Sequence, residues 1–90
     1  MRNLILLLFS LSLFSPFGTK AQSELFSEGN RAYQEEDYLK AIRLYDSVYQ
    51  SGKQSAALHF NLGNAYFQEG NIGKSILHFE KALKLKPQDD

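Results

Sequence analysis

The chain contains no cysteine, no tryptophan and only two prolines among its 90 residues. Without cysteine there is no disulfide framework, no thiolate zinc site, no cysteine nucleophile and no lipid-modified amino-terminal cysteine. The two histidines, His59 and His78, have no carboxylate at ligand spacing. Packing at the edge of a core is therefore the expected role for both, ahead of metal binding. The sequence predicts no metal and no other cofactor.

An excess of charge of one sign is also lacking, because ten Lys and Arg balance ten Asp and Glu. A neutral chain has no strong field to attract a polyanion, and basic residues do not alternate with aromatic ones. Nucleic acid is therefore not an expected partner. The hydrophobic share of 43% and the charged share of 22% are those of an ordinary globular protein. At this length they predict one small folded domain.

No catalytic arrangement of residues is present. Residues 73–75 (Gly-Lys-Ser) end like a phosphate-binding loop, but Gln68 stands where that loop needs its first glycine, and a helix is expected before it rather than a strand. Residues 35–37 bring three carboxylates together between two expected helices. There they fit a solvated turn followed by a helix amino terminus. We expect no enzymatic activity and no small-molecule substrate.

The one long apolar run, Leu4 to Phe14, lies close to the amino terminus. Arg2 precedes it, and a Pro-Phe-Gly break and small residues up to Ala21 follow, which is the order of a secretory signal. The run is shorter than the ~20 residues of a membrane-spanning helix. We expect a signal peptide over residues 1–21, cleaved between Ala21 and Gln22, and export across the inner membrane to the periplasm or medium. The alternative is an uncleaved membrane anchor over residues 4–17.

An internal repeat organises the rest of the chain. A shift of 34 residues brings eight identical pairs into one ungapped register: Phe26 and Phe60, Gly29 and Gly63, Asn30 and Asn64, Gln34 and Gln68, Glu35 and Glu69, Lys40 and Lys74, Ile42 and Ile76, and Gln54 and Gln88. Conservative pairs such as Asp37 with Asn71 and Tyr45 with Phe79 share this register. The sequence therefore predicts two copies of one structural unit, over residues 22–55 and 56–89.

Each copy has the pattern of a helical hairpin, so the expected fold class is all-α. Apolar residues recur at helical spacing over residues 25–33, 38–49, 56–67 and 72–85. Gly52 and Gly70 lie between these segments and are expected in turns, because glycine readily takes the left-handed conformation. Gly29 and Gly63 fall inside helices at a cost of ~1 kcal/mol each relative to alanine. Something in the fold must offset that cost.

The period of 34 residues, together with the segment from Asn61 to Phe67 and the later Gly70, Phe79 and Pro87, resembles the tetratricopeptide repeat family. The resemblance implies two tandem helix-turn-helix hairpins in a fragment of a right-handed α-solenoid. The same resemblance implies that the paired helix approaches closely at Gly29 and Gly63. It also implies a scaffold that binds a peptide or partner protein in a concave groove lined by the first helix of each hairpin. Carried over to this chain, the groove residues are Phe26, Asn30, Tyr33, Gln34, Phe60, Asn61, Asn64, Phe67 and Gln68.

Asparagine amides both donate and accept hydrogen bonds, so Asn30 and Asn64 are expected to hold the backbone of an extended segment. Phe26 and Phe60 stand four residues earlier on the same helix faces and would supply apolar contact. Packing between helices is the alternative role of the aromatic residues. Replacing either asparagine with alanine is expected to weaken partner binding and leave stability nearly unchanged.

A closer resemblance covers almost the whole chain. The signal ending at Ala21 and the segment from Ser55 to Asn64 are similar to the opening of exported tetratricopeptide repeat proteins of bacterial aerotolerance (Bat) operons. This implies a role in envelope assembly or stress tolerance. The alternative function is a membrane-tethered structural subunit whose repeats pack against sister chains.

Repeat units bury their apolar faces against their neighbours. We therefore expect the last helix to leave several apolar residues partly uncovered: Ile76, Leu77, Leu83 and Leu85. Such an edge predicts either that residues 22–90 are the amino-terminal piece of a longer array or that the chain associates with itself there.

Overall fold

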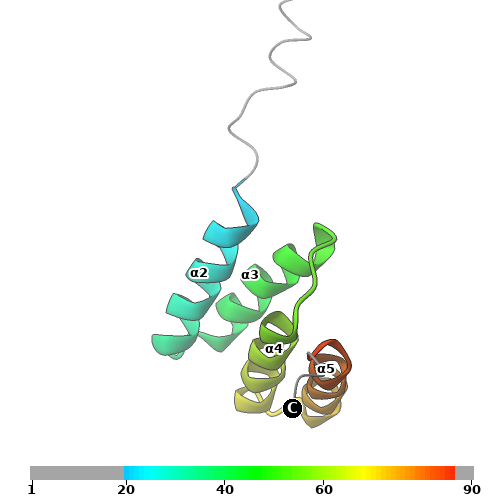
Figure 1. Cartoon of the computed structure of the whole chain (residues 1–90). Coiled ribbons are helices and arrows are strands. Elements are labelled where there is room, and N and C mark those ends of the chain that lie inside the picture. The colour runs from blue at the N-terminus through cyan, green and yellow to red at the C-terminus, as the bar shows by residue number, and fades with distance from the viewer. Residues whose placement is uncertain (1–19, 87–90) are drawn as a thin grey trace, which may run out of the picture.

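The computed structural model describes residues 20–86, which contain four helices: α2 (Gln22–Gln34), α3 (Tyr38–Gln50), α4 (Ala56–Gln68) and α5 (Ile72–Leu85). Each helix packs on the next one in the chain, and α2 also reaches α4 (Figure 1). Within these residues there is no strand. The all-α prediction of two tandem hairpins is thus confirmed. The predicted signal peptide lies outside the described residues, except for Lys20 and Ala21.

Three of the helices begin with a side-chain cap, in which an oxygen accepts a hydrogen bond from the backbone N–H three residues later. The donor–acceptor distances are 3.3 Å for Asp37 and Lys40, 3.0 Å for Ser55 and Leu58, and 3.2 Å for Asn71 and Lys74. Asp37 and Asn71 are equivalent positions of the two copies. The second helix of each hairpin therefore starts in the same way.

The turn before each of these two caps needs one residue in the left-handed region. In the second hairpin it is Gly70, with φ 85°, and in the first it is Glu36, with φ 65°. Gly52, in the link between the hairpins, has φ 94°. The predicted turns at Gly52 and Gly70 are confirmed, while Glu36 holds a conformation that costs a residue with a Cβ about 1–2 kcal/mol.

Glu36→Gly is expected to raise the free energy of unfolding by about 1 kcal/mol, because it removes this backbone strain at an exposed position. Urea denaturation measures the effect. Glu35→Gly is the matched control, since Glu35 has an ordinary φ of −84° and glycine there only adds flexibility to the unfolded chain. An equal response of the two variants would contradict the assignment of strain to Glu36.

The close approach expected at the two helical glycines is confirmed, and an aromatic ring makes it. A Cβ built on Gly29 would lie 2.6 Å from a ring carbon of Tyr45, and one on Gly63 would lie 2.5 Å from a ring carbon of Phe79. The same two rings pack against phenylalanines of the first helices, with centroid distances of 5.7 Å for Phe26 and Tyr45 and 5.7 Å for Phe60 and Phe79. Both hairpins are thus closed by an aromatic pair over a glycine.

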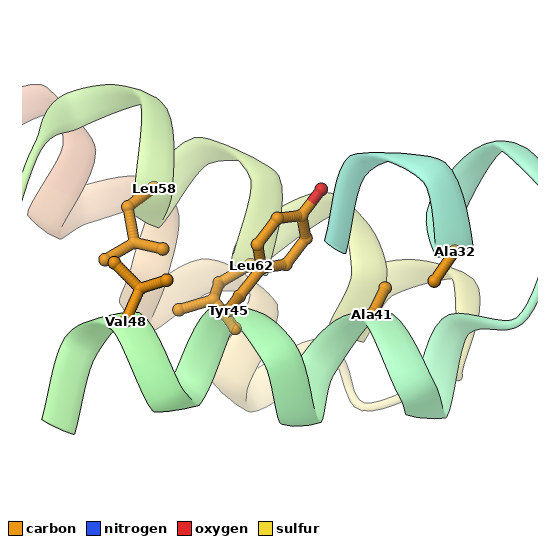
Figure 2. Packing of buried hydrophobic residues seen from close by; sticks show 6 residues of the cluster. All are labelled: Ala32, Ala41, Tyr45, Val48, Leu58 and Leu62. Atoms are coloured by element: carbon orange, nitrogen blue, oxygen red, sulfur yellow. The ribbon is translucent and has the colours of Figure 1, made fainter. Parts of the chain in front are cut away.

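The core joins the two hairpins. Leu58 of α4 lies against Val48 of α3, and Leu62 lies beside Tyr45 (Figure 2). Ala41 of α3 and Ala32 of α2 complete the buried cluster. All six side chains are almost fully buried, so the contact between the two hairpins is part of the hydrophobic core.

The two histidines pack more deeply than the predicted core edge. His59 is fully buried and His78 nearly so, and their Nδ1 atoms lie 2.9 Å apart with the rings stacked. His59 Nε2 lies 2.9 Å from the Gln54 side-chain oxygen, which can only accept. His59 therefore carries its proton on Nε2, and His78 donates its Nδ1 proton to His59 Nδ1.

Candidate functional site

A hollow of about 220 Å³ lies where the first helices of the two hairpins meet. Its lining comes from α2, α3 and α4: Asn30, Tyr33, Gln34, Tyr45, Asn61 and Asn64. All six side chains are neutral, and four carry amides. Five of the six are predicted groove residues, so the structure brings most of the predicted site together. We call this site the amide hollow.

Asn30 is the junction of the amide hollow. Its side-chain oxygen accepts hydrogen bonds from the hydroxyl of Tyr45 at 2.5 Å and from the amide of Asn61 at 3.0 Å. One amide oxygen thus connects α2 to α3 and to α4. The two bonds leave the Asn30 amide nitrogen and the Asn61 oxygen as groups that a ligand can use.

Tyr45 was not among the predicted site residues. Its side chain is 1% exposed, and burial raises the pKa of its hydroxyl to about 12, although the amide of Asn61 nearby opposes that rise. The hydroxyl therefore stays protonated at neutral pH and acts as the donor to Asn30. The signal in the sequence is the repeat register itself, because Tyr45 pairs with Phe79 and only the first copy carries a hydroxyl.

Asn64 is equivalent to Asn30 in the repeat register and has a different environment. Phe79, which replaces tyrosine, offers it no hydroxyl, and the Asn64 side chain makes no hydrogen bond within residues 20–86. Asn64 is half-buried and faces the amide hollow. Its donor and its acceptor are both available to a ligand.

The predicted aromatic residues do not line the amide hollow, except for Tyr33. Phe26 lies in a second hollow with Val48 and Leu58, and Phe60 lies in a third with Phe79. Tyr33 also packs on Tyr38, with ring centroids 5.2 Å apart. The rings of Phe26, Tyr33 and Phe60 thus pack against other rings. Phe60 remains 53% exposed, and its role in binding stays a prediction. Phe67 and Gln68 are exposed at the end of α4.

Over residues 20–86, no three His, Cys, Asp or Glu side chains gather as they would around a metal ion. In the same stretch no helix has the length and apolar character needed to span a membrane.

Two comparisons with known proteins, one against family models and one against individual proteins, indicate the same family. Residues 56–89 match the family model of the tetratricopeptide repeat. Tetratricopeptide repeat protein 16 of Macaca fascicularis and that of Homo sapiens are each 29% identical to this chain over 58 residues. These matches support the tetratricopeptide repeat family. The aligned part is 64% of this chain and 7% of each relative, so the chain spans a small part of the length of these proteins.

The matched range contains α4 and α5, the second hairpin of the chain. The first hairpin lies before the matched range and repeats its geometry in three respects. It has the equivalent cap at Asp37, the equivalent glycine contact at Gly29 and the equivalent aromatic pair of Phe26 and Tyr45. The two hairpins of this chain thus share one plan, and the second is the one that the tetratricopeptide repeat model matches.

The structure corrects the expected effect of replacing Asn30. Asn30→Ala leaves the Tyr45 hydroxyl and the Asn61 amide without their acceptor, which is expected to lower the free energy of unfolding by about 1–3 kcal/mol. Asn64→Ala removes no hydrogen bond of the described chain and is expected to change it by less than about 0.5 kcal/mol. Thermal denaturation of the two variants measures the difference. Equal effects would contradict the conclusion that the Asn30 side chain stabilises the fold by connecting three helices.

Proposed function

We propose that this chain is a scaffold for protein interaction that holds an extended segment of a partner by its backbone in the amide hollow. The observation that carries the proposal is the set of unpaired amide groups on Asn64, Asn61 and Asn30, which face one hollow shared by both hairpins. Tetratricopeptide repeats act as protein-interaction scaffolds, which supports the same reading.

The chemistry of the amide hollow favours a peptide backbone over other ligands. Amides that donate and accept match the alternating C=O and N–H groups of an extended chain. The lining offers no charge to a phosphate or carboxylate. The volume of about 220 Å³ is below the ~300–1,000 Å³ of pockets that enclose small molecules, so the amide hollow suits a contact along a longer ligand rather than an enclosed substrate.

The test is selection of binding peptides from a displayed random library on the full chain, followed by calorimetry on the variants. Asn64→Ala is expected to lower the affinity of the selected peptides by about 10-fold, the equivalent of 1.4 kcal/mol. Gln50→Ala, an exposed amide on α3 outside the amide hollow, is the control and should leave the affinity unchanged. Unchanged affinity in Asn64→Ala would move the binding surface away from the amide hollow.

Export to the periplasm or medium, and a role in envelope assembly or stress tolerance as in the exported Bat-operon proteins, are part of the proposal. The signal-like order of residues 1–21 supports export, and the similarity of the sequence from Ser55 to Asn64 supports the role. Amino-terminal sequencing of the protein from a host envelope fraction is the test. A chain that begins at Gln22 is expected, whereas a membrane-bound chain that keeps Met1 would favour the tethered structural subunit.

A further inference from the structure

The outer side of the second hairpin carries an apolar groove that nothing in residues 20–86 covers. It has a volume of about 590 Å³ and runs between the first half of α4 and α5, with Phe60, Phe79, Ala82 and Leu83 in its lining. Leu83 is 68% exposed, and Ile76 and Leu85 beside it on α5 are also exposed, as the sequence predicts. We call this surface the α5 groove.

The chain shows what fills the equivalent surface of its first hairpin. In the repeat register, Phe79 and Ala82 of the α5 groove correspond to Tyr45 and Val48 of α3. Those two residues are covered by α4, through Leu62 beside Tyr45 and Leu58 against Val48 (Figure 2). Beside that contact there remains a hollow of about 460 Å³, with Leu58 and Phe26 in its lining. Phe26 is the residue equivalent to Phe60 of the α5 groove.

The covering helix has a definite pattern. Leu58 and Leu62 are one helical turn apart and point to the same neighbour, and Asn61 between them donates its amide to Asn30. The residue equivalent to Asn30 in the second hairpin is Asn64, whose acceptor is available. The same contacts would recur on the α5 groove if a helix presented leucine, then asparagine three residues later, then a second leucine.

We infer that the α5 groove is a docking site for an amphipathic partner helix carrying this Leu-x-x-Asn-Leu pattern. The α5 groove shares Asn61 with the amide hollow, and the partner asparagine would contact Asn64 there. The apolar contacts of the two leucines do not depend on the proposed function. Apolar helix faces that seat in apolar grooves through residues one turn apart are a common mode of recognition.

A second copy of this chain does not supply that helix by end-to-end stacking. The helix equivalent to α4 in the first hairpin is α2, and its residues at the three positions are Glu24, Ser27 and Glu28. These residues line a polar hollow on the outer face of α2. Pressing two carboxylates into the α5 groove would strip them of water against a lining that offers them one cation, Lys86, among aromatic and aliphatic residues.

The probe is a synthetic peptide of residues 55–68, held helical by a staple on the side away from its leucines and carrying a fluorophore. We expect fluorescence anisotropy to show that it binds the full chain. Replacing both leucines of the peptide with serine should abolish binding, and a stapled peptide of residues 21–34 from α2 should not bind.

Two variants of the chain decide where the peptide docks. Leu83→Glu is expected to weaken binding at least 10-fold. Leu39→Glu, at an exposed leucine of α3 (56%) outside the α5 groove, should change it less than 2-fold. Circular dichroism is the check that both variants remain folded. Binding that is insensitive to Leu83→Glu would mean that the peptide displaces α4 from α3, and would overturn the inference. Binding of the α2 peptide, or a dimer of the full chain that Leu83→Glu dissolves, would show that a second copy is the occupant and would also overturn it.

Discussion

Gly29→Ala is expected to lower the free energy of unfolding by about 3 kcal/mol, the upper end of the range for overpacking a core. The new Cβ would lie 2.6 and 2.7 Å from two ring carbons of Tyr45, distances at which one group must move. The ring cannot move easily, because Tyr45 is buried and its hydroxyl is bonded to Asn30. Urea denaturation followed by circular dichroism measures the loss.

Two other glycines serve as internal controls. Gly63→Ala creates the same clash with Phe79, but Phe79 is only half-buried and lies beside the α5 groove, so its ring has room to move and a smaller loss of about 1–2 kcal/mol is expected. Gly73→Ala, in the exposed first turn of α5 with no atom closer than 4.0 Å, should raise stability by up to about 1 kcal/mol. If Gly29→Ala lowered the free energy of unfolding no more than Gly63→Ala does, this would contradict the conclusion that burial and the bond to Asn30 hold the Tyr45 ring in place.

Stability is expected to fall as the pH drops from 7.5 to 5, and the buried histidine pair is the reason. Burial lowers the pKa of His59, and the nearby Lys81 lowers it further. Burial, His59 and Lys81 lower the pKa of His78; Asp46 opposes this shift and Lys74 adds to it. The unfolded chain takes up protons near pH 6.5 while the folded chain does not. The free energy of unfolding therefore falls below pH 6.5, by at most about 2.7 kcal/mol per pH unit for two protons, until the folded pKa values are reached.

The first hairpin supplies the matched control for this pH dependence. Its residues equivalent to the two histidines are Leu25 and Leu44, so the double variant His59→Leu and His78→Leu copies a pair that the same fold already accommodates. Its stability should be nearly constant between pH 7.5 and 5. Denaturation curves at half-unit steps measure both profiles, and an equally steep loss in the double variant would assign the acid sensitivity to other groups.

The sequence predicts the helices well because each boundary has a local chemical cause. Asp37, Ser55 and Asn71 cap the helices that follow them, and glycines mark two of the turns. The turn at Glu36 shows the limit of such reasoning, since a glutamate there takes the conformation that Gly70 has in the second copy. Its place in the repeat, rather than its own preference, determines its backbone angles.

The candidate site was harder to predict, because it depends on side chains that meet across helices. The 34-residue register identifies Asn30 and Asn64 as equivalent, yet their environments differ through one hydroxyl, that of Tyr45. Likewise the two histidines give no signal of their pairing, because they lie on different helices and meet only once α4 and α5 pack. The repeat register thus predicts where a residue lies in its helix, while the side chains around it determine which hydrogen bonds it makes.

Side-chain amide spectra of the isotope-labelled chain, recorded while a selected peptide is added, test directly whether the peptide binds in the amide hollow. The amide resonances of Asn64, Asn61 and Gln34 are expected to shift together, because these side chains line the amide hollow. Those of Gln50 and Gln54, exposed on the far end of α3 and in the link between the hairpins, should stay in place. Shifts confined to Gln50 and Gln54, with the three residues of the amide hollow unmoved, would contradict binding in the amide hollow.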